Sequence, residues 1–195
     1  MSVTLLLIDD GRPYRERCVA SINEMLPSVE RLVEVDDSDH ELGFAGAIQR
    51  GWDQIRTDWV FHVEADFVFR APVPLDRMIA VMKRKPYLAQ IALKRQAWNA
   101  EEREAGGIVE CHPEDFEQVT DRGDIWTEHR RFFTTNPCLY PAALCRQGWP
   151  QVEHSEGIFT HLLLADSKLR FAFWGPKFSA PAVEHIGEVR TGVGY

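Results

Sequence analysis

The sequence predicts an α/β protein, a single domain built on a mostly parallel central sheet with helices on both faces. Two observations lead to this prediction. Short apolar runs of strand length alternate with helical stripes through the first half of the chain, and each of the first three runs ends in acidic residues. The length of 195 residues suits one domain. A hydrophobic content of 45% is enough for a core without disulfide bonds.

The start of the chain predicts a strand, a helix and a second strand. Residues 3–8 are continuously apolar, which indicates a strand buried on both faces. Pro13 suits the first turn of the helix that follows, and Pro27 ends it. Residues 31–35 form the second strand. Between the two prolines, apolar side chains recur at helical spacing, at Tyr14, Cys18, Ile22 and Met25.

A second helix is expected from about Gly43, and a third strand at residues 59–63. Strands and helices that alternate at this pitch predict parallel strands joined by crossover helices. The buried stripe of the second helix is expected at Phe44, Ile48, Trp52 and Ile55.

The second half is less regular. A strand is expected at residues 87–93, and the polar residues 96–131 are expected to form long loops or a small hairpin. Residues 155–165 predict a helix capped by Ser155. "LRFAFWGP" predicts a late strand, and the glycine-rich tail after it is expected to be mobile. The inward side chains are expected at Leu75, Met78, Ile79 and Met82 in one helix, and at Ile158, Leu162 and Leu163 in the last.

The charge and composition exclude several classes of protein. The chain has 22 basic and 30 acidic residues, which argues against nucleic-acid binding, because that needs a positive face. No apolar stretch approaches the ~20 residues of a membrane span, and the first apolar run lacks the basic start of a signal peptide. The four cysteines have no C-x-x-C spacing, so reduced thiols are expected. We therefore expect a cytoplasmic protein.

Acidic residues follow each of the first three strands. Ligands of open parallel sheets bind outside the carboxyl ends of the strands, so these acids should meet at one edge. Glu64 and Asp66 are two apart on an extended segment and point the same way. They repel unless a cation or a proton lies between them, and hard oxygen ligands suit Mg²⁺ or Mn²⁺. The alternative is a sharp turn with solvated acids. The six acids are Asp9, Asp10, Asp36, Asp37, Glu64 and Asp66.

The order of these segments resembles a family 2-type glycosyltransferase with the GT-A fold. "VTLLLIDDGRPYRERCVASI", "VERLVEVDDSD" and "GFAGAIQRGWDQIRTDWVFHVEADFVF" are similar to the first half of that family, where one strand ends in an Asp-Asp motif and the next in a D-x-D motif. "NPCLYPAAL", "WPQVEHSEGIFTHLLLADSKLRFAFWG" and "VEHIG" resemble later elements in the same order. The resemblance covers most of the chain. It implies a nucleotide-binding half at residues 1–95 and an acceptor-side half at residues 96–195.

The resemblance also implies roles for individual residues. Asp66 matches a metal ligand of the D-x-D motif, and Glu64 stands at its first position, from which it reaches the ribose or a metal-bound water. His185 in "VEHIG" matches a late histidine that completes the metal shell, and an imidazole favours Mn²⁺ over Mg²⁺. Glu156 matches the catalytic base, although only one acid of the usual pair is present. The nucleoside pocket would be lined by Asp9, Asp10, Asp36 and Asp37.

Simpler readings of these residues stay open. Glu156 also suits the first turn of a helix, where an acid is favourable by under ~1 kcal/mol, and His185 also suits a surface position. Lys94 and Arg95 are candidates for contact with the donor's phosphates, as is Trp98 for contact with its sugar, or they form a solvated loop.

The glycines of the tail would allow Arg190 and Tyr195 to close over the diphosphate, or the terminus is simply unfixed.

The sequence thus predicts a metal-dependent, inverting transfer of a sugar from a UDP-, GDP- or dTDP-linked donor to an acceptor hydroxyl. Two rivals remain. A nucleotidyltransferase acting on sugar phosphates shares a similar sheet but usually has a glycine-rich loop with a basic residue, and "DDGRP" offers only Gly11 and Arg12. A non-catalytic protein that binds nucleotide sugars would also fit the missing acid near Glu156.

Overall fold

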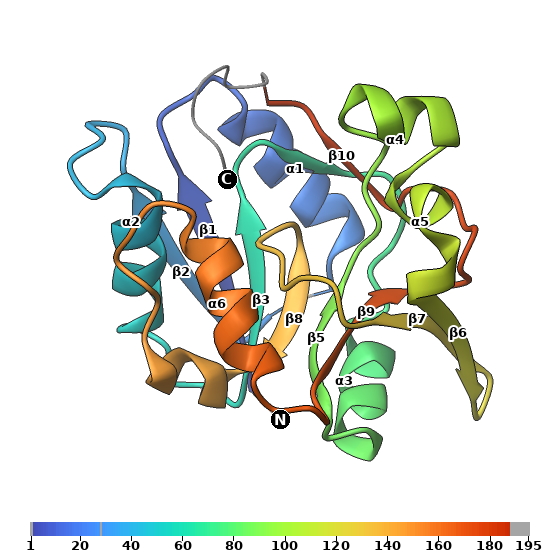
Figure 1. The fold of residues 1–195 in the computed structure, drawn as a ribbon. Helices are drawn as coiled ribbons and strands as arrows, with labels where there is room; N and C mark the ends of the chain where they lie inside the picture. Colours follow the sequence, from blue (N-terminus) through green and yellow to red (C-terminus); the bar gives the residue numbers. More distant parts are fainter. Residues whose placement is uncertain (1, 28, 188–195) are drawn as a thin grey trace.

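The computed structural model describes residues 2–27 and 29–187 (Figure 1). Within them, one eight-stranded sheet has the order β2-β1-β3-β8-β5-β9-β7-β6, and a small sheet pairs β10 with β4. The strands are β1 Val3–Asp9, β2 Arg31–Asp36, β3 Trp59–Glu64, β4 Phe67–Phe69, β5 Leu88–Ala92, β6 Phe116–Asp121, β7 Asp124–His129, β8 Cys138–Pro141, β9 Arg170–Trp174 and β10 Val183–His185. The helices are α1 Arg15–Met25, α2 Gly43–Trp52, α3 Leu75–Arg84, α4 Ala100–Ala105, α5 Ile108–Cys111 and α6 Ser155–Leu164, with 3-10 turns η1 Pro113–Asp115 and η2 Ala142–Gln147.

The large sheet is mostly parallel, as predicted. β1 pairs in parallel with β2 and β3, and β5 pairs in parallel with β9. β8 lies antiparallel between β3 and β5, and β7 lies antiparallel between β9 and β6. Of the eight strands in this described sheet, β7 and β8 therefore run against the other six.

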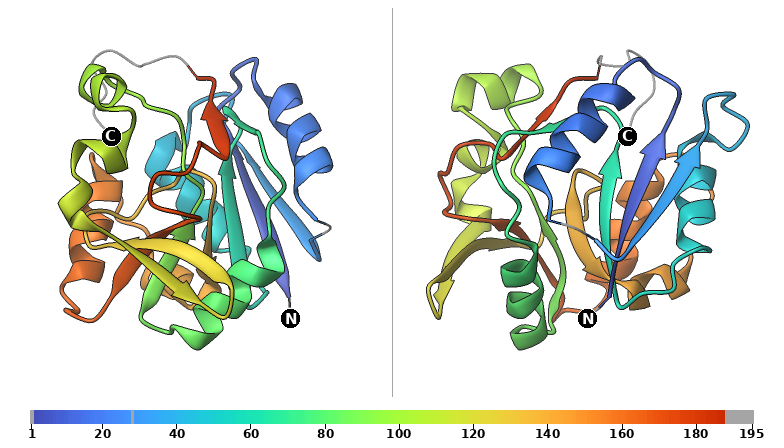
Figure 2. Two further views of the ribbon diagram at one scale, coloured as in Figure 1. Left: turned by 90° about the vertical axis from the view of Figure 1, so that its right-hand side faces the viewer. Right: turned by 180° about the vertical axis from the view of Figure 1, so that it is seen from behind.

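Both faces of the sheet are covered, which confirms the predicted α/β layering. Successive residues of β1 point to opposite faces, so Leu5 and Leu7 enter one apolar cluster while Leu6 and Ile8 enter another. The first cluster includes α1 and α3, and the second includes α2 and α6. Figure 2 shows α1 and α6 on opposite sides of the sheet. Gly51 lets α2 approach closely, because a Cβ there would lie 2.5 Å from Leu6 Cδ1.

The predicted strands at residues 3–8, 31–35 and 59–63 are confirmed. Each continues one residue further, into the acid that follows the apolar run, so that β1, β2 and β3 end at Asp9, Asp36 and Glu64. The acids therefore belong to the ends of the strands and their positions are fixed by sheet pairing.

Residues 96–131, for which we predicted long loops or a small hairpin, contain a hairpin and two short helices. The β6–β7 hairpin turns at Arg122 and Gly123, whose φ angles of 54° and 82° are both positive. Positive φ at both central residues is the requirement of a type I′ turn. Because this segment is polar, it has no apolar stripe at helical spacing that would have predicted α4 or α5.

The predicted orientation of the last helix was wrong. Ile158 and Leu162 are 44% and 60% exposed, whereas Phe159 and Leu163 are buried. The buried stripe thus follows the i, i+4 spacing from Ser155 through Phe159 to Leu163. Of the three side chains expected to face inward, it contains Leu163 alone. Ser155 is also not the cap. It is the first helical residue, and its Oγ accepts a hydrogen bond from Trp149 Nε1 at 2.9 Å.

Among the described helices, none is long and apolar enough to cross a membrane. The four cysteines are free, and Cys18, Cys138 and Cys145 are buried.

Candidate functional site

The carboxyl ends of β1, β2 and β3 meet at one edge of the sheet, at the top of Figure 1. Asp9 is in register with Asp36, and Ile8 with Glu64, so the acids converge as the sequence predicted. A cavity of about 510 Å³, the first cavity, opens at this edge. Its charged, histidine and aromatic lining residues are Asp10, Arg12, Asp37, His40, Phe44, Glu64, Asp66, His154 and Glu156.

Four of the six predicted acids line the first cavity, and the other two hold turns beside it. Asp9 Oδ1 accepts the Gly11 N–H at 3.0 Å, and Asp36 Oδ1 accepts the Ser38 N–H at 2.9 Å. Burial raises the pKa of Asp9 above its ordinary value, while the hydrogen bonds from Ser38 lower the pKa of Asp36. Neither side chain is among those that line the first cavity.

Asp66 is the most buried acid of the first cavity, with 2% exposure. Its Oδ2 accepts a hydrogen bond from Arg12 Nη2 at 2.6 Å and lies 2.9 Å from His185 Nε2. Burial by itself would raise the pKa of Asp66, but the hydrogen bond and charge of His185, together with Arg12, lower it. Asp66 Oδ1 is buried and has no hydrogen-bond partner among residues 2–27 and 29–187. The backbone of Gly187 passes close to the Asp66 carboxylate, and a Cβ at this position would lie 2.4 Å from Oδ2.

Arg12 bridges two acids of the first cavity, a role that we did not predict from the sequence. Its Nε lies 2.6 Å from Asp10 Oδ2 and its Nη2 lies 2.6 Å from Asp66 Oδ2. Burial would lower the pKa of Arg12, but the two carboxylates raise it, so the guanidinium stays charged. Gly11, in the left-handed region with φ of 77°, makes the turn that points Arg12 back over the strand ends.

His185 is fixed from several sides. It is opposite Phe67 in the β4–β10 pair, and its backbone N–H and C=O both pair with the Gln96 side-chain amide, at 2.9 and 2.8 Å. Its ring centroid lies 4.1 Å from that of Trp98 and 4.7 Å from that of Phe67. The structure thus brings His185 to Asp66, as the resemblance implied, across 119 residues of sequence.

Glu64 and Glu156 stand between the first cavity and a second one, because both line both cavities. Glu156, in the first turn of α6, accepts the Thr135 N–H at 2.7 Å and lies 3.2 Å from Thr135 Oγ1. Burial raises the pKa of Glu156, against the opposing effect of these hydrogen bonds. Burial, and then the charge of Asp66, raise the pKa of Glu64 well above its ordinary value. Two acids with raised pKa values beside a cavity are typical of catalytic sites.

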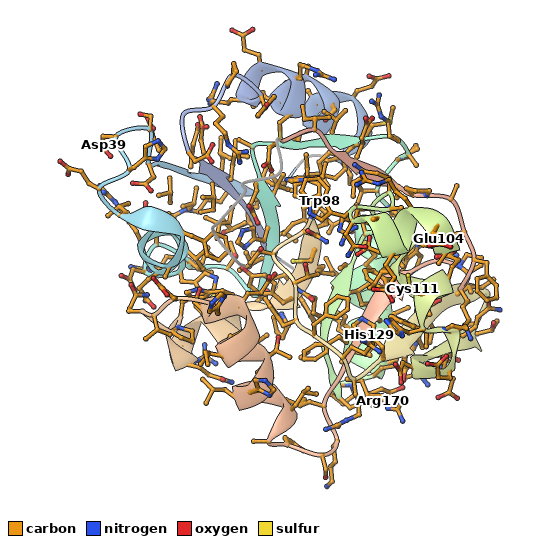
Figure 3. The ribbon with its side chains drawn as sticks, turned by 45° about the horizontal axis from the view of Figure 1, so that its top comes forward. Asp39, Trp98, Glu104, Cys111, His129 and Arg170 are labelled. Carbon is orange, nitrogen blue, oxygen red and sulfur yellow. The ribbon has the colours of Figure 1, made fainter. Side chains whose placement is uncertain are left out.

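The second cavity has a volume of about 270 Å³ and a mostly apolar lining. It lies beside α5 and β9, and Trp98 forms part of its wall. Figure 3 shows Trp98 between α4 and the end of β3. Besides Glu64, Glu156 and His185, the lining residues are Phe67, Arg95, Trp98, Ile108, Phe132, Phe133, Thr134, Thr135, Asn136 and Phe173. Of these ten residues, Trp98 and Arg95 were the two predicted from the sequence as candidates for contact with the donor.

The two basic residues after β5 form internal ion pairs. Lys94 is 4% exposed, and its Nζ lies 2.7 Å from Glu110 Oε1. Arg95 pairs with both carboxylate oxygens of Glu102, at 2.6 and 3.1 Å. Arg95 lines the second cavity, whereas Lys94 lines neither cavity. Arg190 and Tyr195 lie outside the described residues.

Asp66 and His185 are the predicted metal ligands that the structure brings together. Oδ1 of Asp66 is buried and has no hydrogen-bond partner within the described ranges, so it is an unused oxygen ligand, and His185 Nε2 lies 2.9 Å from the other oxygen of the same carboxylate. One carboxylate and one imidazole form a donor set that suits Mn²⁺. Within residues 2–27 and 29–187, the one group of three acids and histidines spaced to hold an ion is His112, Glu114 and Asp115, where Asp115 is already paired with Arg131.

The sheet order and the cavity at the carboxyl edge define a GT-A-like fold, and comparison with solved structures confirms it. The structure of S. aureus TarS 1–349 matches with a TM-score of 0.59 and 15% identity over 94% of this chain and 60% of that chain. The same protein in complex with UDP-GlcNAc matches with a TM-score of 0.57 and 14% identity, over 94% and 58%. Its complex with UDP matches with a TM-score of 0.56 and 15% identity, over 94% and 60%. This chain therefore spans about three fifths of TarS 1–349. No family model and no curated protein matches the sequence.

Proposed function

We propose that the chain transfers a sugar from a nucleotide-sugar donor to an acceptor hydroxyl. The observation that carries this proposal is the pair of adjoining cavities with Glu64 and Glu156 between them. A transfer between two substrates needs two subsites that meet at the catalytic groups. The complexes of S. aureus TarS with UDP and UDP-GlcNAc support a nucleotide sugar as the ligand of the first cavity.

In this proposal Glu156 is the general base. The acceptor oxygen attacks the anomeric carbon of the sugar, its proton passes to Glu156, and the bond from that carbon to the diphosphate oxygen breaks. A single displacement of this kind inverts the anomeric centre. A base works best when its pKa approaches the working pH, and burial moves the pKa of Glu156 in that direction. The Thr135 N–H fixes the carboxylate at 2.7 Å.

Asp66 and His185 would hold Mn²⁺ or Mg²⁺, which would offset negative charge on the departing diphosphate. The first cavity needs positive charge for such a ligand, because five of its lining residues are acids and Arg12 is the one arginine or lysine among the described ones. Arg12 already lies against Asp66 and can contact the same phosphates.

Asp10, Asp37 and Phe44 would receive the nucleoside at the far side of the first cavity. Asp9 and Asp36 contribute by holding the turns after β1 and β2. The predicted donor contacts of Lys94, Arg95 and Arg190 add no support to the proposal.

The test is incubation with UDP-, GDP- and dTDP-sugars in the presence of Mn²⁺. We expect release of the nucleoside diphosphate from one donor class, and loss of this release on addition of a chelator. Pyrophosphate formed from a nucleoside triphosphate and a sugar phosphate would instead indicate a nucleotidyltransferase. Donor binding without release, with a range of acceptor alcohols, would indicate a binding protein.

A further inference from the structure

We infer that the second cavity receives the acceptor, and that the acceptor is a neutral alcohol carried on a planar apolar ring, such as an aryl alcohol. This inference rests on the proposed function and names the substrate class of its second subsite. It is drawn from the lining, the charge balance and the size of the second cavity.

The walls of the second cavity are dominated by rings from separate parts of the chain. Phe67 comes from β4, Trp98 from the segment before α4, Phe132 from the segment after β7, and Phe173 from β9. Phe132 and Phe173 meet edge to face with centroids 6.2 Å apart. An aromatic guest gains both apolar burial and ring–ring contact in such a site. Ile108 adds a further apolar side chain.

The charges around the second cavity disfavour an anionic acceptor. Glu64 and Glu156 both face it. The one arginine or lysine among its described lining residues, Arg95, is neutralised by two contacts with Glu102. A phosphate or carboxylate on the acceptor would therefore meet two acids, and the proposed metal on Asp66 and His185 would already be balanced by the diphosphate of the donor.

Several polar groups of the second cavity already have partners within the protein, which disfavours a sugar acceptor. Apart from the two acids, His185 and the paired Arg95, the polar side chains that line the second cavity are Thr134, Thr135 and Asn136. Thr135 contacts Glu156, and Thr134 Oγ1 accepts the Asn136 N–H at 3.2 Å. A monosaccharide would have to compete with these internal contacts for its hydrogen bonds, whereas an aromatic ring would leave them intact.

The volume sets the size of the acceptor. About 270 Å³ is larger than the roughly 150 Å³ apolar cavity that holds benzene in another protein. It therefore accommodates one substituted ring or two fused rings. A ring seated among Phe67, Phe132 and Phe173 can place a benzylic or phenolic hydroxyl toward Glu156, the residue that the two cavities share.

The experiment measures binding by saturation-transfer NMR in one sample containing UDP and Mg²⁺, which is diamagnetic and leaves the ligand signals sharp. The probes are benzyl alcohol, methyl β-glucoside and glycerol 3-phosphate. We expect transfer to benzyl alcohol and to UDP, and none to the other two alcohols. With a nucleotide sugar that the protein cleaves, benzyl alcohol should also raise release of the nucleoside diphosphate.

The matched variants are Phe132→Ala and Phe178→Ala. Phe132 lines the second cavity, whereas Phe178 is 65% exposed and lines neither cavity. Phe132→Ala should weaken benzyl alcohol binding about three- to tenfold with UDP still bound, because one ring contact is lost. Phe178→Ala should leave benzyl alcohol binding unchanged.

Two results would overturn the inference while leaving the proposed function intact. One is UDP binding together with tighter binding of methyl β-glucoside or glycerol 3-phosphate than of benzyl alcohol. The other is benzyl alcohol binding that Phe132→Ala and Phe178→Ala affect equally. Absence of UDP binding would overturn the proposed function, and the inference with it.

Discussion

The two cavities share Glu64 and Glu156 but are otherwise built in opposite ways. The first cavity is lined by charged side chains that lie at or just after strand ends, and ion pairs such as Arg12 with Asp66 hold them. The second is lined by rings gathered from distant segments, with its one arginine neutralised. The difference lies in what surrounds the two shared acids, which is ion-paired charged side chains in the first cavity and aromatic rings in the second.

The largest effect is expected at the boundary, from Glu156→Gln. The amide keeps the shape of the side chain but cannot take a proton, and loss of a general base typically costs 10²–10⁴-fold in rate. Turnover should fall by about that factor while UDP affinity changes little, measured by release of the nucleoside diphosphate and by calorimetry.

The matched control for Glu156 is Glu153→Gln, a change at an exposed acid just before α6 that lines neither cavity. It should retain full turnover. Equal turnover in the two variants would remove Glu156 from the mechanism.

The next effect is on the first cavity, from Asp66→Ala. The change leaves Arg12 and His185 without their shared carboxylate, and hydrogen bonds to charged groups contribute roughly 1.5–3 kcal/mol each. We expect a loss of at least one such contribution, roughly 1.5–3 kcal/mol, in the free energy of unfolding, measured by urea denaturation at pH 7, and loss of Mn²⁺-dependent UDP binding.

Asp66 also sets a pH dependence of stability. Its pKa is lowered in the folded protein, so its contribution is present above the unfolded value of about 3.9 and is lost as pH falls through the folded value. The difference in stability between the wild type and Asp66→Ala should therefore shrink at acidic pH. Asp39→Ala, at the exposed loop labelled in Figure 3, should show neither effect. A difference that grows on acidification would contradict the assignment.

The contrast also explains what could be predicted from the sequence. The first three strands were predictable because each is an apolar run ended by acids, and parallel pairing then fixes those acids at one edge. The role of Arg12 could not be predicted from the sequence, because its partner Asp66 lies 54 residues away along the chain. Its role depends on the turn at Gly11, which one glycine in the sequence does not specify.

The second cavity could not be predicted in the same way. Phe132 and Phe173 lie in different segments, and each reads as an ordinary core residue until the fold brings them together. The error on α6 has a similar cause. Ile158 and Phe159 are both apolar, so hydrophobicity alone did not decide which of the two faces the core. Lys94 is a different kind of case. As a basic residue after a strand it was predicted to contact phosphate, but in the fold it forms an internal ion pair with Glu110.

A smaller effect should separate the two cavities by ligand. Phe44 lines the first cavity but not the second, and its ring contacts that of Trp149 with centroids 6.3 Å apart. If a base stacks there, Phe44→Ala should weaken UDP binding roughly tenfold, within the 1–3 kcal/mol typical of stacking on an aromatic side chain. Benzyl alcohol binding should not change. Weakening of benzyl alcohol and UDP to the same extent would show that the cavities do not act as separate subsites.

The smallest effect concerns the proton at the boundary between the cavities. Because burial raises the pKa of Glu156, turnover at saturating Mn²⁺ should fall on acidification with a midpoint above the value of about 4.3 for a free glutamate. The Thr135 hydroxyl opposes that rise, so Thr135→Val should move the midpoint to higher pH, whereas Thr135→Ser should restore it. The backbone N–H of Thr135 remains in both variants and keeps Glu156 in place. A midpoint that moves to lower pH in Thr135→Val would mean that the acid controlling turnover is not Glu156.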